Sequence, residues 1–219
     1  MEYSITDVLN REKLQEITEA FHAVTGLSSS VVDKDGTVLA GSGWQEICSR
    51  FHRVNEKTAR NCLKSSEAMA ERFKEDCPHI VWKCPNGLYD AAAPVIVDGE
   101  HIASLFTGQF LMVRPDISDI EQFSSRARFA GFNETDYLNA LEKVPTITPA
   151  QLDGILDFLK NYADILSDMG TSLENREEGA SEKDAKALGM SLVNQPADKA
   201  KTRVGSKCAC KSALQTPSD

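Results

Sequence analysis

The 219-residue sequence contains no apolar run that approaches the roughly eighteen residues needed for a membrane-spanning helix. Its first residues, MEYSITDVLNREK, lack both the basic segment and the apolar segment of a secretory signal peptide. We therefore expect a cytoplasmic protein. In that compartment the six cysteines are expected to be thiols, metal ligands or redox groups, and not a disulfide framework.

Basic residues are in short supply. The chain has 24 Lys and Arg against 33 Asp and Glu, a formal net charge of −9, and no basic patch falls on any predicted helix. Because nucleic-acid phosphates are bound by clustered Lys and Arg, this balance argues against direct binding of nucleic acid.

Common catalytic motifs are also missing. The sequence has no GxSxG, no HExxH and no glycine loop of the kind that binds phosphate. Its four histidines are scattered, and none pairs obviously with a nucleophile. We expect a protein that is not an enzyme. Its length and its hydrophobic content of 41% suit one globular domain of ordinary size, with room for an appendage.

The strongest structural pattern is a predicted antiparallel hairpin, Leu88–Val97 and His101–Val113, joined by Asp98-Gly99. Both runs are almost continuously apolar, so we expect both faces of this hairpin to be covered. A second hairpin is predicted over residues 28–40. Helices are predicted at 10–24, 45–53, 55–75 and 149–173, with two more within 117–143. The fold class is therefore α+β.

The last predicted helix, which begins at Pro149, carries apolar residues at alternating spacings of three and four. Either this stripe packs on its own domain, or it forms a seam with a second chain, because a 3.5-residue repeat keeps two helices in contact. The stripe consists of Leu152, Ile155, Leu159, Tyr162, Leu166, Met169 and Leu173. We place the domain at residues 1–170. Residues 171–219 are polar and are expected to form a disordered tail, with a weak helix at 185–193.

Polar side chains interrupt the central apolar hairpin at Asp90, Ser104, Thr107 and Gln109. A buried polar group without a partner costs about 1–3 kcal/mol, so each needs a partner from the protein or from a bound molecule. Asp90 and Gln109 are the main candidates for ligand binding, with Ser104 nearby and aromatic walls from Trp82, Tyr89, Phe106 and Phe110. Alternatively, Asp90 caps a local turn and Gln109 bonds the main chain.

Four cysteines fall within the domain, at Cys48, Cys62, Cys77 and Cys84. Their spacings are wide, and none forms the CxxC pair of a zinc knuckle. They are either small core residues, as free cysteines often are, or a metal, iron–sulfur or redox-sensing set that His52 and His79 could complete. The pair Cys208 and Cys210 in the tail could bind metal weakly or oxidise.

Several segments of the chain follow one another in the order found in a known family. This order begins with SITDVLNREKLQEITEAFHAVTGLSSSVVDKDG, continues with Cys48 and Cys62, and then has CPNGL and YDAAAPVIVDGEHIASLFTGQFL. Over residues 4–168 the chain resembles the PocR sensory domain family. The residues that carry the resemblance are Cys48, Cys62, Cys84, Gly87, Asp90, Pro94, Gly99, Gly108 and Gln109.

The resemblance implies a PAS/GAF-like antiparallel sheet covered by helices, with long terminal helices, as found in bacterial and archaeal signalling proteins and transcription regulators. Such domains are thought to bind small hydrocarbon derivatives such as diols. Two features depart from the family: Pro85 stands where histidine is common, and no output module is recognisable after residue 170. We therefore expect a sensor that signals through its flanking helices to a partner protein or a second copy. The alternatives are a cysteine-based metal, iron–sulfur or redox sensor on the same fold, and a protein-interaction adaptor with a degenerate pocket.

Overall fold

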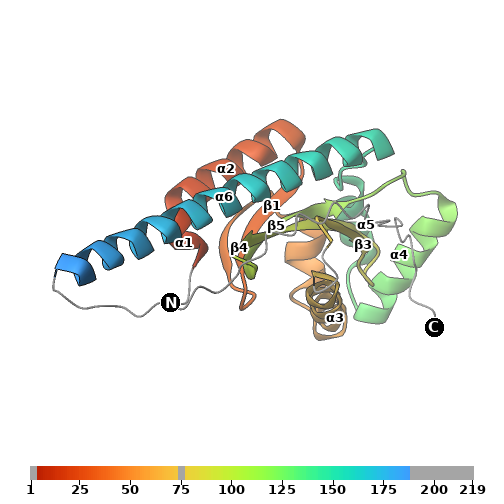
Figure 1. Ribbon diagram of the computed structural model, residues 1–219. Helices are drawn as coiled ribbons and strands as arrows, with labels where there is room; N and C mark the ends of the chain where they lie inside the picture. Colours follow the sequence, from red (N-terminus) through yellow and green to blue (C-terminus); the bar gives the residue numbers. More distant parts are fainter. Residues whose placement is uncertain (1–3, 74–76, 188–219) are drawn as a thin grey trace.

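The computed structural model describes residues 4–73 and 77–187, and it contains a five-stranded sheet with helices on both faces (Figure 1). The strand order is β2-β1-β5-β4-β3, and every pair of neighbours is antiparallel. The strands are β1 (Ser28–Asp33), β2 (Val38–Ser42), β3 (Ile80–Lys83), β4 (Tyr89–Val97) and β5 (Glu100–Phe110). The predicted α+β, PAS/GAF-like fold is confirmed.

The helices fall into two groups (Figure 1). The helices α2 and α6 lie side by side across one face of the sheet, together with the short α1, while η1 and α3 cover the other face. The remaining pair, α4 and α5, packs against η1 beside the sheet. The bounds are α1 (Ile5–Val8), α2 (Arg11–Thr25), the π-helix η1 (Ile47–His52), α3 (Glu56–Phe73), α4 (Ile117–Ala130), α5 (Glu134–Glu142) and α6 (Pro149–Ala187).

The central hairpin turns where the sequence predicts. Asp98 and Gly99 have φ angles of 48° and 86°, and two successive positive φ angles are typical of the tight turn that matches strand twist. The second strand ends at Phe110, three residues before the predicted end. This hairpin places β4 and β5 in the middle of the sheet, where helices cover both faces.

The two faces of the sheet differ in chemistry. Toward α6, strand β4 presents Ala91, Ala93, Val95 and Val97, which are buried in the largest apolar cluster of the described residues. The other face carries small or polar side chains next to a few aromatic rings, because adjacent residues in a strand point to opposite sides. Its residues include Ser28, Ser30, Trp82, Asp90, Ala92, Ser104 and Phe106. This second face is the one that η1 and α3 cover.

Helix α6 packs on its own domain along part of the predicted stripe. Leu159 and Leu166 are buried against the sheet, and the hydroxyl of Ser167 accepts a 3.0 Å hydrogen bond from the main chain of Ile96. Met169, in contrast, is 40% exposed. The helix therefore uses one side for its own core and leaves another side open.

Helix α6 continues past the predicted domain boundary to Ala187, so residues 171–187 of the expected tail are helical. Residues 174–187 are rich in Glu, Ala and Lys, which extend a helix readily once it has formed. Residues 188–219, with Cys208, Cys210 and most of the predicted 185–193 helix, lie outside the described residues. None of the described helices is both long and apolar enough to cross a membrane.

Candidate ligand-binding site

Asp90 lies at an irregularity between the two central strands. Tyr89 pairs with Phe110 and Asp90 pairs with Gly108, which leaves Gln109 as an extra residue in β5. Gln109 has a φ of 59°, an unusual conformation for a residue other than glycine, and its main-chain N–H donates a 3.1 Å hydrogen bond to Asp90 Oδ1. A bulge of this kind redirects side chains and is common beside binding sites.

Gly108 makes room for the carboxylate. A Cβ atom at this position would overlap Oδ1 of Asp90, so the side chain of Asp90 occupies the space that a larger residue would fill. The carbonyl of Gly108 accepts a 2.9 Å hydrogen bond from the Ser28 hydroxyl. The pairing of glycine and aspartate across the two strands therefore fixes where the carboxylate lies.

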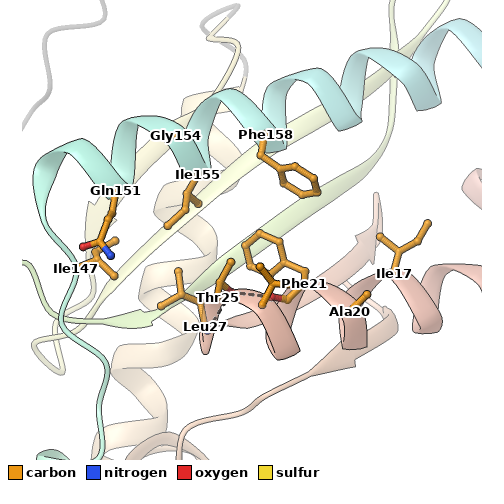
Figure 2. Close-up of a pocket in the computed structure, with 11 residues that line it drawn as sticks. Ile17, Ala20, Phe21, Thr25, Leu27, Ile147, Gln151, Gly154, Ile155 and Phe158 are labelled. Carbon is orange, nitrogen blue, oxygen red and sulfur yellow. Dashed lines mark hydrogen bonds between the residues drawn. The ribbon is translucent and has the colours of Figure 1, made fainter.

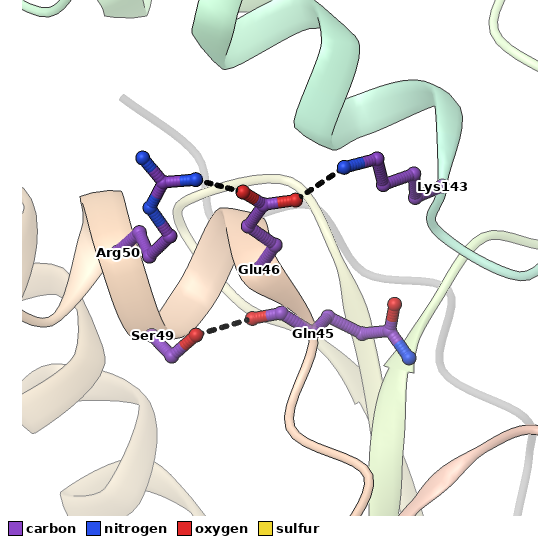
Figure 3. A network of polar contacts seen from close by, with 5 residues as sticks. All are labelled: Gln45, Glu46, Ser49, Arg50 and Lys143. Carbon is purple, nitrogen blue, oxygen red and sulfur yellow. Dashed lines mark hydrogen bonds and ion pairs between the residues drawn. The ribbon is translucent and has the colours of Figure 1, made fainter.

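The side chain of Gln109 holds η1 in place. Its Oε1 atom accepts a 2.6 Å hydrogen bond from the main-chain N–H of Gln45, and the carbonyl of Gln45 accepts one from the Ser49 hydroxyl at 3.2 Å (Figure 3). Next to it, Glu46 pairs with Arg50 and, at 2.6 Å, with Lys143. Gln109 thus connects the bulge beside Asp90 to Gln45, which lies just before η1. This agrees with the alternative interpretation of the sequence, in which Gln109 bonds the main chain.

Asp90 is an incompletely compensated acid inside the fold. Burial raises the pKa of its carboxyl to about 6, against the opposing effects of the Gln109 N–H and the nearby Arg53. In the described part of the chain, the Gln109 N–H is the one hydrogen-bond donor to this carboxylate. Arg53 stacks over the ring of Trp44 at 4.6 Å. Among the described residues, Asp90 therefore has a single hydrogen-bond donor, and its carboxylate can accept more hydrogen bonds.

Three of the four domain cysteines have pKa values that the charge of this carboxylate raises further. Burial raises the pKa of the Cys48 thiol, and it raises that of Cys84 to about 12, with the Asp90 charge as the second cause for both. Burial also raises the pKa of Cys62. The charge of Asp90 acts on the pKa of Cys48, Cys62 and Cys84 alike. All three are protonated thiols at neutral pH.

The predicted metal site is not preassembled. Within residues 4–73 and 77–187, no group of three or more His, Cys, Asp or Glu side chains is arranged to hold a metal ion. Cys77 is a half-buried free cysteine in the segment before β3. Burial lowers the pKa of His79, and the charge of Asp157 in α6 opposes that shift. Cys48, Cys62, Cys77 and Cys84, as the described part of the chain places them, are not arranged as the ligands of a metal ion.

A series of buried polar groups links Cys48 to Tyr137 through His52. His52 Nε2 and the Tyr137 hydroxyl lie 2.7 Å apart, and His52 Nδ1 is 3.9 Å from Cys48 Sγ. Burial, with a smaller effect from Arg126, lowers the pKa of His52 to about 3. Because the imidazole stays neutral and the Cys48 thiol stays protonated, the pair lacks the thiolate of an activated cysteine nucleophile.

The structure brings together some of the predicted ligand-binding residues. Trp82 pairs with Asp90 across β3 and β4, donates to the Ser65 hydroxyl at 2.7 Å, and meets Phe106 edge-to-face at 6.2 Å. Asp90, Trp82 and Phe106 therefore share one face of the sheet. Ser104 is on the same face but two rungs further along, where it bonds His101 at 2.9 Å.

Tyr89 points the other way. It stacks on Phe110 with ring centroids 6.1 Å apart, and both pack in the cluster that contains Phe21 of α2. The two rings lie on the α2 and α6 side of the sheet, so Tyr89 does not form a wall beside Asp90. Adjacent residues of a strand face opposite sides, and this geometry separates Tyr89 from Asp90.

Several residues near the site were not singled out from the sequence. Besides Arg53, Trp44 and Tyr137, these include Asn86, which is fully buried and donates to the Thr58 carbonyl at 3.0 Å and to Cys62 Sγ at 3.4 Å. The sequence signal for Asn86 was its position in Cys84-Pro-Asn-Gly87, because it precedes a glycine whose φ is 99°. Asn86 orders the loop that carries Cys84.

Comparison with known proteins gives one match. A family model described as the sensory domain found in PocR matches residues 7–171. No curated protein and no solved structure matches the chain. The match covers all five strands, the helices from α2 to α5 and the first part of α6, and it includes Asp90, Gly108 and Gln109.

Proposed function

Because the chain belongs to the PocR sensory-domain family, we propose that it senses a small hydrocarbon derivative, such as a diol, as part of a bacterial or archaeal signalling or regulatory system. The ligand would bind beside Asp90, between the sheet and the helices η1 and α3. Its hydroxyl groups would donate hydrogen bonds to the carboxylate.

The observation that carries this proposal is that Asp90 is a buried carboxylate with a single hydrogen-bond donor among the described residues. A carboxylate in an apolar setting with one donor is unfavourable, and Gly108 and the bulged Gln109 both shape the backbone around it. A hydroxyl-bearing ligand would supply the missing donors. A protein that needed only a filled core would be more stable with an apolar residue at this position.

The neighbouring side chains suit a short hydrocarbon. Ala92 and Ser30 are small, and the rings of Trp82 and Phe106 are close by. A small organic ligand is held mainly by apolar surface, with a few placed polar groups that fix its orientation. Arg53 could further pair with the carboxylate once the ligand has excluded water from the site.

The site connects to both terminal helices. The hydroxyl of Ser28, which follows the end of α2 by three residues, bonds the Gly108 carbonyl opposite Asp90. Strand β4, which carries Asp90, packs along α6. A ligand that binds one arrangement of the bulge more tightly would shift the population of states of these helices. We propose that α2 and α6 carry the signal to a partner protein or a second copy.

The thiols favour a second candidate function. The charge of Asp90 acts on Cys48, Cys62 and Cys84, so a redox-dependent or metal-dependent rearrangement of these residues would alter the same site. This alternative requires the cysteines to move, because their present arrangement does not hold a metal. Metal analysis of protein purified without oxygen, with Cys62→Ser and Cys84→Ser as comparisons, tests it.

The proposal is tested by thermal unfolding in the presence of diols of two to four carbons. A ligand that binds only the folded state raises the melting temperature, so at least one diol should raise it by several degrees in the wild type. Asp90→Ala should abolish that rise. Ser104→Ala, on the same face but two rungs away, is the matched control and should keep it.

Two results would count against the proposal. One is a rise in melting temperature of equal size in the wild type and in Asp90→Ala, since binding would then not involve the carboxylate. The other is the absence of any rise with every diol, together with bound metal in the anaerobic protein, which would favour the cysteine-based sensor.

A further inference from the structure

Trp44 lies on the same side of the sheet as Asp90, over β1 and β2. A Cβ atom at Gly41 of β2 would lie 2.9 Å from the Trp44 ring and 3.3 Å from the Cβ atom of Ser30. Ser30 pairs with Phe106, which shares the face that carries Asp90. The Trp44 ring therefore rests on that face, at a position where glycine leaves room for it.

A short series of hydrogen bonds joins the Trp44 segment to Asp90. Gln45, the residue after Trp44, donates its main-chain N–H to the Gln109 side chain at 2.6 Å, and the Gln109 N–H donates to Asp90 at 3.1 Å. Strand β1 lies two strand spacings from β4, which is about 10 Å. A molecule that extends from the Asp90 carboxylate toward Trp44 must therefore be several carbons long.

Arg53, directly after η1, is an exposed cation without an acidic partner in the part of the chain that the structure describes. Its guanidinium lies over the Trp44 ring, 4.6 Å from the ring centroid. The neighbouring Arg50 and Arg60 each pair with the glutamate four residues earlier. The residue four positions before Arg53 is Ser49, so the same helical spacing supplies no carboxylate to Arg53.

The charge of Arg53 acts on the buried groups of the site. Burial raises the pKa of Asp90, and the charge of Arg53 is one of the effects that oppose it. The same charge opposes the effect of burial on the pKa of Cys48 and of Cys62. A guanidinium group has five N–H donors in one plane and binds a carboxylate through two parallel hydrogen bonds. Stacking on Trp44 occupies the face of this plane and leaves the donors at its edge available to a ligand.

We propose that Arg53 sets the charge of the ligand, and that the site takes a short-chain hydroxycarboxylate whose hydroxyl donates to Asp90 and whose carboxylate pairs with Arg53. This inference rests on the proposed function and narrows its ligand class from a neutral diol to a hydroxy acid. A diol would leave the guanidinium without a counter-charge. An amino alcohol is the opposite case, because its ammonium group could pair only with Asp90.

The apolar groove between α2 and α6 does not offer the same match (Figure 2). It lies on the opposite side of the sheet from Asp90, and none of the described residues that line it is charged. A carboxylate moved from water into this groove would have no counter-charge. Gly154 lies in its wall, where an added Cβ atom would meet no other atom within 4 Å. Gly154→Gln therefore changes this groove and leaves the Asp90 side of the sheet intact.

Isothermal titration of three four-carbon compounds into the full chain at pH 7.5 tests the inference. The compounds are 4-hydroxybutyrate, 1,4-butanediol and 4-amino-1-butanol. The wild type should bind 4-hydroxybutyrate at least about tenfold more tightly than either of the others, since a hydrogen bond to a charged group contributes about 1.5–3 kcal/mol. Arg53→Gln should remove this preference, and Arg53→Lys, which keeps the charge but not the planar fork, should retain part of it. Gly154→Gln should bind like the wild type.

Four results would overturn the inference. Equal affinity for 4-hydroxybutyrate and 1,4-butanediol in the wild type, or a preference that survives Arg53→Gln, would show that Arg53 does not set the charge of the ligand, while diol sensing at Asp90 would stand. Tightest binding of 4-amino-1-butanol would make Asp90 a site for a cation. Loss of binding in Gly154→Gln would place the ligand in the groove. Absence of binding by all three compounds would overturn the proposed function as well. The melting temperature of each variant shows that it is folded.

Discussion

The carboxylate of Asp90 occupies the space where a side chain at position 108 would begin, so glycine opposite aspartate is a steric requirement of this strand pair. The bulged Gln109 donates its N–H to the same carboxylate. The glycine, the bulge and the acid on the neighbouring strand therefore form one local structure.

Replacing Gly108 with alanine should disrupt that structure. The new methyl group would displace the Asp90 carboxylate or force the strands apart, and overpacking of this kind destabilises by about 1–3 kcal/mol. Urea unfolding measures the change. Gly154→Ala is the matched control, because its methyl group meets no atom and should stabilise the protein by up to about 1 kcal/mol.

Replacing Asp90 with asparagine should change how the free energy of unfolding depends on pH. Burial raises the pKa of the carboxyl from 3.8 to about 6, so the folded protein binds this proton more tightly than the unfolded chain does. The stabilising effect of the protonated form is present below pH 3.8 and is lost as the pH rises through 6. A pKa difference of about 2 corresponds to at most about 3 kcal/mol.

The wild type should therefore lose stability relative to Asp90→Asn between pH 4 and pH 7, by up to about 3 kcal/mol. The difference between the two proteins is the quantity to measure. His52 acts in the opposite sense: its pKa is lowered to about 3, so its contribution is lost as the pH falls below 6.5. The contribution of His52 is the same in the wild type and in Asp90→Asn, so it cancels in the difference between them. A constant difference across this range would contradict the assignment.

Tyr137→Phe should destabilise the protein by about 1–3 kcal/mol. The substitution removes the hydroxyl that lies 2.7 Å from His52 Nε2 and leaves a buried imidazole nitrogen without its partner. Chemical unfolding at pH 7 gives the magnitude. Tyr162→Phe is the comparison, since its buried hydroxyl has no hydrogen-bond partner in the described part of the chain, and its loss should be close to neutral.

The Cys48 and Cys84 thiols should react slowly with iodoacetamide in the native protein. Burial raises the pKa of both, and alkylation requires the thiolate. We expect labelling at pH 8 to be at least tenfold slower than in the urea-unfolded chain, as measured by peptide mass spectrometry. Rapid native labelling of either residue would indicate an activated thiol and would favour the redox alternative.

The sequence predicted the elements of this fold better than the details of the site. The Asp98-Gly99 turn was readable because its two residues suit the turn by themselves. The bulge at Gln109 was not, since it depends on how β4 and β5 register against each other, and both runs look uniformly apolar. For the same reason, the sequence could not show that Tyr89 and Asp90 face opposite sides.

Long-range contacts account for the other residues that were missed. The bond between His52 and Tyr137 joins η1 to α5, and nothing near either residue indicates the other. The effect of the Arg53 charge on the pKa of Asp90 likewise joins residues far apart in the sequence. The boundary at residue 170 was drawn where apolar residues stop, but a helix already formed continues through residues of high helix propensity.

Isothermal titration of a diol into the wild type and into Asp90→Asn at pH 7.5 tests the central claim most directly. Asparagine keeps the size of the side chain and one carbonyl oxygen but removes the charge, so affinity should fall at least tenfold, the equivalent of about 1.4 kcal/mol. Ser104→Ala should bind like the wild type. Equal affinity in the wild type and in Asp90→Asn would contradict the account, because the carboxylate would then not be what the ligand recognises.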